Sequence, residues 1–145
     1  MPEYQSTYDA SLAIGSPGMV ATDSDFENIV SKQIETATVG FGLAVGAGAA
    51  DGSVKLSGTG YEGVTVMDKA QTSGDYAVGV TAAIMNRGTI FVTVDGNVTP
   101  SGTVTYTEAT GAIGVKAVAA GIVAIPNAKF LDTVSSGGIA RLFLG

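Results

Sequence analysis

The strongest constraint on the fold of this chain is the alternation of side chains within residues 76–106. In the middle of this stretch, Ile90, Val92 and Val94 fall on one side of a period-2 ribbon, and Phe91, Thr93 and Asp95 fall on the other. The following Gly96 and Asn97 tolerate positive φ angles and favour a turn. The pattern predicts a half-buried strand at residues 90–95. It predicts a second strand at 76–85, a turn at 86–88 between the two, and an antiparallel meander at the centre of the fold.

The composition extends this prediction to the whole chain. The 145 residues include 17 Val, 9 Ile and 16 Thr but only 6 Leu, and β-branched residues favour pleated sheets. Further strand candidates recur about every ten residues, separated by Gly-rich turns. They lie at residues 18–22, 36–45, 54–56, 64–67, 115–125, 128–131 and 137–144. The expected fold is all-β, a single-domain β-sandwich or barrel of jelly-roll-like form at residues 18–145.

Two segments depart from the strand pattern. Residues 23–35 combine a capping-box pair, Ser24 and Glu27, with a weak helical face of Ile29, Val30 and Ile34, and they predict at most one short helix. Residues 1–17 are expected to form an extended N-terminal arm that finishes in a Ser-Pro-Gly turn. The arm tyrosines could fold back on the domain or pack on a neighbouring molecule.

Charge and hydropathy limit the partners. The net charge is −6, and residues 1–35 hold six acidic residues against Lys32 alone. This imbalance disfavours binding to nucleic acid and favours either a solvated surface or a basic partner. The longest apolar run, residues 117–126, is about half of the roughly 20 residues that a membrane-spanning helix needs, so no membrane association is expected. The N-terminus lacks the features of a secretory signal, which predicts synthesis in the cytoplasm.

The residue types exclude several kinds of chemistry. The chain has no His and no Cys, which rules out a histidine-based triad, a cysteine nucleophile and the usual zinc sites. Asp23, Asp25 and Glu27 have the spacing of the start of a calcium loop, but Asn28 and Ile34 occupy positions that need Gly and Glu. Capping or solvent exposure explains these carboxylates better than catalysis. We therefore predict no enzyme activity, no metal and no cofactor.

A family resemblance supplies the functional expectation. Taken in order, GMVA at 18–21, FGLAV at 41–45, residues 86–106, IPNAKFLDT at 125–133 and GGIARLFL at 137–144 resemble the structural cement, or capsid decoration, proteins of tailed bacteriophages. The resemblance implies a compact β domain that binds the outer surface of an icosahedral head, reinforcing contacts between copies of the major capsid protein. It also implies a virion location, synthesis in the host cytoplasm and a homo-oligomer, either a dimer or a trimer.

With this resemblance, the acidic N-terminal segment is expected to supply capsid contacts, and the C-terminal strand is expected to contribute to subunit packing. The candidate contact residues are Tyr4, Tyr8, Asp9, Met19, Asp23, Asp25, Phe26, Leu142 and Phe143. The alternative is a carbohydrate- or receptor-binding β module of a phage fibre or surface adhesin. The absence of Trp and of a clear binding-loop cluster counts against that alternative.

Overall fold

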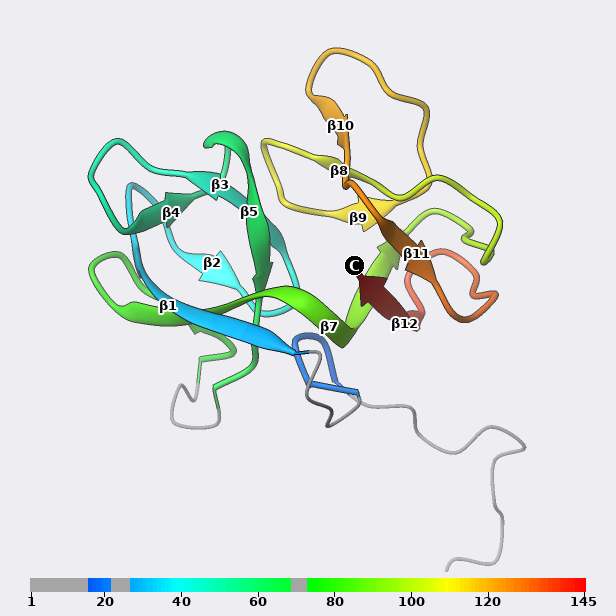
Figure 1. Ribbon diagram of the computed structural model, residues 1–145, viewed down its shortest axis with the longest axis horizontal. Helices are drawn as coiled ribbons and strands as arrows, with labels where there is room; N and C mark the ends of the chain where they lie inside the picture. The colour runs from blue at the N-terminus through cyan, green and yellow to red at the C-terminus, as the bar shows by residue number, and fades with distance from the viewer. Residues whose placement is uncertain (1–15, 22–26, 69–72) are drawn as a thin grey trace, which may run out of the picture.

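The computed structural model describes residues 16–21, 27–68 and 73–145, and every regular element in these ranges is a β-strand (Figure 1). The strands are β1 (Asn28–Ile34), β2 (Val39–Gly40), β3 (Ala44–Ala47), β4 (Ser53–Lys55), β5 (Thr59–Thr65), β6 (Asp75–Tyr76), β7 (Thr81–Asp95), β8 (Thr105–Thr107), β9 (Ile113–Gly114), β10 (Ile122–Ala124), β11 (Ala128–Phe130) and β12 (Ile139–Leu144). The all-β prediction is confirmed.

The first half of the domain is a closed barrel. Its strands pair in the order β1, β4, β3, β5 and β7, and β7 pairs again with β1, which closes the ring. The ring lies on the left in Figure 1, with β2 inside its outline. The β1–β4 pair is parallel, and the other four pairs of the ring are antiparallel. A small core fills it, made of Ile34, Val39, Val45, Val54, Tyr76, Ala82 and Ile84. The barrel form of the prediction is therefore confirmed, and the jelly-roll form stays a prediction.

Strand β7 joins this barrel to the second half of the domain. Its first part pairs with β1 and β5, and its second part pairs with β12 over residues 88–93. The predicted turn at residues 86–88 is wrong, as is the meander of consecutive strands, because β7 runs through this point without reversing. Asn86 is an extra residue opposite β1, and Gly88 adopts a φ of 124°, so a bulge absorbs the change of direction.

The second half packs against the outside of the barrel. Here β12 pairs with β11, while β9, β8 and β10 extend the sheet from the end of β7. The larger core between the halves includes Ala44, Val64, Met85, Ile90, Val92, Val94, Ile113, Phe130, Ala140, Leu142 and Leu144. Neighbouring residues of β7 serve different cores, since Ile84 points into the barrel and Met85 into the larger core. The two halves are therefore one domain.

The helix prediction for residues 23–35 is wrong where the structure describes it. Residues 28–34 form β1, which is antiparallel to β7 and places Lys32 opposite Ala82. A ladder along β7 satisfies the backbone groups of this segment, and this tertiary pairing overrides its weak helical pattern. Residues 22–26 lie outside the described part of the chain.

The apolar run at residues 115–125 also differs from its prediction. Only Ile122–Ala124 forms a strand, and residues 116–121 form an exposed connection instead. Their sequence, KAVAAG, is rich in Ala and Gly, which have low strand propensity.

Candidate functional site

The entry segment, residues 16–21, is the first described part of the chain, and it packs against β7. The Met19 N–H donates to the Ser16 carbonyl at 3.0 Å and Gly18 has a φ of 83°, which confirms the predicted turn. Beyond the turn, the segment runs antiparallel to β7. Gly18 N–H donates to the Phe91 carbonyl at 2.7 Å, Phe91 N–H to the Met19 carbonyl at 2.9 Å, and Ala21 N–H to the Thr89 carbonyl at 2.9 Å.

Close backbone packing holds the same segment on its other side. Met67 N–H donates to the Gly18 carbonyl at 2.7 Å. A Cβ atom at Gly18 would lie 2.8 Å from both the Met67 nitrogen and the Phe41 Cβ, so the position has no room for a side chain. In Figure 1 the segment is the blue stretch below β7. Residues 16–21 are therefore fixed on the domain from both sides.

The structure describes only three of the candidate contact residues. Tyr4, Tyr8, Asp9, Asp23, Asp25 and Phe26 lie outside the described residues. Met19 is half-buried in the entry segment, and its role as a contact residue stays a prediction. Leu142 has no exposed surface and belongs to the larger core of its own chain. Phe143, one position further along β12, is half-buried opposite Thr89 of β7.

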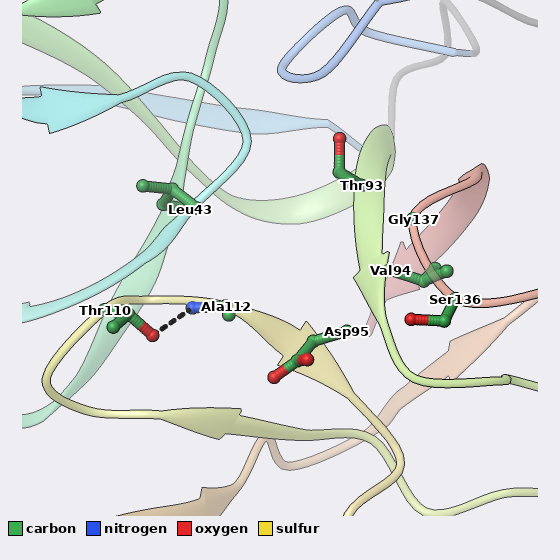
Figure 2. A pocket seen from close by; sticks show the side chains of 8 residues that line it. All are labelled: Leu43, Thr93, Val94, Asp95, Thr110, Ala112, Ser136 and Gly137. Atoms are coloured by element: carbon green, nitrogen blue, oxygen red, sulfur yellow. Dashed lines mark hydrogen bonds between the residues drawn. The ribbon is translucent and has the colours of Figure 1, made fainter.

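An open pocket of about 560 Å³ lies at the end of β7 (Figure 2). Its lining residues are Leu43, Thr93, Val94, Asp95, Thr110, Ala112, Ser136 and Gly137. Leu43 and Thr110 stand on one side in Figure 2, with Val94, Asp95 and Ser136 on the other. The sequence did not reveal this pocket, because its walls come from four segments that are far apart in the chain. None of its lining residues is aromatic, and aromatic rings are a common element of ligand pockets.

Two of the described carboxylates, Glu35 and Asp132, serve local structure. The Glu35 carboxylate accepts hydrogen bonds from the Ala49 N–H at 2.9 Å, the Ser53 hydroxyl at 2.7 Å and the Ala50 N–H at 3.1 Å. These donors, Ala49 first, lower the pKa of Glu35 to about 2. Asp132 accepts two hydrogen bonds from the Arg141 guanidinium, which lowers the pKa of Asp132. Both carboxylates therefore hold neighbouring backbone segments together.

Neither a metal site nor a membrane span is found in the described ranges. Among residues 16–21, 27–68 and 73–145, no three His, Cys, Asp or Glu residues gather in a way that could hold a metal ion. The same ranges contain no helix of the length and hydropathy needed to cross a membrane. The described residues thus form a small β-structured module.

The comparisons with known proteins place this module in a family. A family model described as structural cement protein (E217 gp24/Pam3 gp6) matches residues 4–145. The chain therefore belongs to the structural cement protein family of bacteriophages, and the resemblance seen in the sequence is confirmed.

Solved structures show the same fold. A chain in "The capsid of Myoviridae Phage XM1" is similar over 100% of this chain and 98% of its own length, with a TM-score of 0.75 and 15% identity. The head fiber gp8.5 N base of bacteriophage phi29 is similar over 82% of this chain and 94% of its own, with a TM-score of 0.55 and 10% identity. No curated protein matches the sequence significantly.

Proposed function

We propose that this protein binds the outer surface of an icosahedral phage head and stabilises contacts between neighbouring major capsid proteins, without catalysing a reaction. The observation that carries the proposal is the family match, which spans residues 4–145 and so covers almost the whole chain. The fold shared with a chain of a phage capsid along its whole length supports it.

The entry segment suggests how the arm contributes to binding the phage head. The backbones of Gly18 and Met19 are hydrogen-bonded to β7 and Met67. If the arm binds a capsid protein, force on the arm therefore passes directly to the strands of the domain. A head displays the same binding site many times in a fixed array, so weak single contacts suffice for stable decoration if the bound molecules also touch one another.

The test is a decoration assay on heads that lack this protein. Purified full-length chain should bind to saturation at a fixed number of copies per head, and it should raise the temperature at which the heads release their DNA. Failure of the full-length chain to bind such heads contradicts the proposal.

Deleting residues 2–15 tests the arm separately. This deletion keeps residues 16–21 on β7, so we expect an unchanged melting temperature and a loss of head occupancy of about tenfold or more at limiting concentration. Undiminished occupancy would show that the arm is not the capsid contact. Two results would favour the receptor-binding alternative: binding of the isolated domain to glycans, and a count of only a few copies of the protein per virion.

A further inference from the structure

The chain contains two Asp-Gly pairs, Asp51-Gly52 and Asp95-Gly96, and their surroundings in the structure differ. This dipeptide is chemically labile, because the backbone nitrogen of the glycine can attack the side-chain carboxyl of the aspartate. Glycine has no side chain to hinder the approach, and it allows a wide range of backbone conformations. Whether a pair reacts in a folded protein therefore depends on how freely the carboxyl group and the glycine N–H can move.

The Asp51-Gly52 pair lies in the loop between β3 and β4, at the left edge of the barrel in Figure 1. Both residues are exposed, and a Cβ atom added at Gly52 would have no other atom within 4 Å. Within the described part of the chain, neither the Asp51 carboxylate nor the Gly52 N–H forms a hydrogen bond or an ion pair. The Ser53 N–H closes the turn on the Ala50 carbonyl through a long hydrogen bond of 3.3 Å. The two reacting groups can therefore approach each other.

The Asp95-Gly96 pair is held at both of its reacting groups. The Asp95 carboxylate forms a 2.8 Å ion pair with Lys116, and the Gly96 N–H donates to the Ser136 hydroxyl oxygen at 3.3 Å. Asp95 is also the last residue of β7, where it pairs with Gly114 of β9. A reaction at this pair requires these contacts to open first, which lowers its rate.

We propose that Asp51 is a site of spontaneous conversion to isoaspartate and that Asp95 is protected from this conversion. The Gly52 nitrogen forms a bond to the side-chain carboxyl carbon of Asp51. One water molecule leaves, made from the proton of that nitrogen and the hydroxyl group of the protonated carboxyl. A second water molecule then hydrolyses the resulting five-membered succinimide ring. Attack on the former side-chain carbonyl restores aspartate, whereas attack on the backbone carbonyl breaks the original peptide bond and leaves the chain running through the side chain. No other reagent is consumed.

The hydrogen bonds around this turn connect the conversion to the stability of the barrel. Glu35 accepts hydrogen bonds from the Ala49 N–H at 2.9 Å and the Ser53 hydroxyl at 2.7 Å, one on each side of the reacting pair. The Gln33 N–H of β1 donates to the Gly52 carbonyl at 3.0 Å. These bonds restrain the turn and so slow the conversion. Because isoaspartate adds one carbon atom to the backbone, a completed conversion strains the same bonds and weakens the attachment of the loop to β1.

Peptide mapping of the full-length protein after incubation at neutral pH and physiological temperature tests this assignment. Electron-transfer fragmentation in a mass spectrometer distinguishes isoaspartate from aspartate. In the folded protein, isoaspartate should form at Asp51 at least about tenfold faster than at Asp95. In urea, where the contacts of both pairs are lost, the two rates should become similar. Glu35→Gln should raise the rate at Asp51 about fivefold, because it weakens the hydrogen bonds that restrain the turn.

Two changes at position 51 provide matched controls. Asp51→Glu should abolish the conversion, since the corresponding six-membered ring forms far more slowly, and it should leave the melting temperature unchanged. Asp51→Asn should accelerate the conversion, because ammonia leaves in place of water. Equal rates at Asp51 and Asp95 in the folded protein overturn the proposal. So does a folded Asp51→Asn variant that stays intact for as long as the urea-unfolded variant takes to convert. Neither outcome depends on whether the protein binds a phage head.

Discussion

Glu35 shows how a single carboxylate organises a loop near the barrel. It accepts three hydrogen bonds from Ala49, Ala50 and Ser53, and Ser53 also donates to the Ala50 carbonyl. No local sequence pattern singles out this residue, because its donors are 14 to 18 positions away. These hydrogen bonds lower the pKa of Glu35, because the donors stabilise its ionised form.

Glu35→Gln should therefore destabilise the protein in a pH-dependent way. The pKa of Glu35 falls from 4.5 to about 2 on folding, so its stabilising effect is complete above pH 4.5 and is lost as the pH falls towards 2. Thermal melts of wild type and variant should differ most near neutral pH and converge as the pH approaches 2. Asp51→Asn, an exposed change in the same loop, is the control. A difference between wild type and Glu35→Gln that is constant with pH contradicts the assignment.

Gly18 is the residue on which the packing of the entry segment depends. Gly18→Ala adds a Cβ with contacts of 2.8 Å at a φ of 83°, whereas Gly79 has a similar φ of 86° and nothing within 4 Å of its added Cβ. We expect Gly79→Ala to cost about 1–2 kcal/mol from backbone conformation alone. Gly18→Ala should cost about 1–3 kcal/mol more, because it adds overpacking. Chemical denaturation of both variants measures the difference, and equal losses would show that the contact at Gly18 is unimportant.

Strand β12 illustrates what a period-2 pattern predicts well. The alternation in residues 139–144 places Ala140, Leu142 and Leu144 on one face, and these three are the buried residues of the strand. The alternation at Ile90, Val92 and Val94 was confirmed in the same way. Phe91 is also buried despite facing the opposite side, where the entry segment bonds to its backbone. Alternation shows which side chains share a face, but not which distant segment will cover the other face.

The burial of Leu142 leads to a prediction about its role. Leu142→Ala removes a side chain with no exposed surface and should cost about 2–5 kcal/mol of unfolding free energy. Leu142→Ala should weaken self-association no more than its loss of folding stability alone would. Phe143→Ala, at the half-buried neighbour, should destabilise the fold less. Urea unfolding at two protein concentrations separates a core role from a subunit contact. An unfolding midpoint that depends on protein concentration for wild type, but not for Leu142→Ala, would support a subunit contact.

Pairing partners and bends were the part of the fold that local sequence could not predict. Residues 86–88, Asn-Arg-Gly, favour a turn when considered alone, but pairing on both edges of β7 keeps the chain extended there. The parallel pairs β1–β4 and β7–β9 join segments separated by about 20 residues, and no local signal specifies them. The candidate sites also differ in whether local sequence predicts them. The turn at Ser16 was predicted from Pro17 and Gly18, whereas the pocket at the end of β7 exists only after four distant segments meet.

The whole molecule should unfold as one unit because β7 contributes to both cores. Ile34 lies in the barrel core and Ile113 in the larger core, and both are fully buried. Ile34→Val and Ile113→Val should each cost about 0.5–1.5 kcal/mol, and both should shift a single thermal transition. Calorimetry checks this, with equal calorimetric and van't Hoff enthalpies as the expected result. Two separate transitions, each moved by only one variant, would show that the halves unfold independently.

The antiparallel run of the entry segment along β7 also determines how the protein carries mechanical load. A pull on Ser16 directed along β7 acts in shear on three backbone hydrogen bonds at once, those joining residues 18, 19 and 21 to Phe91 and Thr89. The force then passes into the longest of the described strands, which is anchored on both sides by β1, β5 and β12. If residues 1–15 bind a head, as proposed above, a pull on them would be resisted by the sheet as a whole, instead of breaking the hydrogen bonds one at a time.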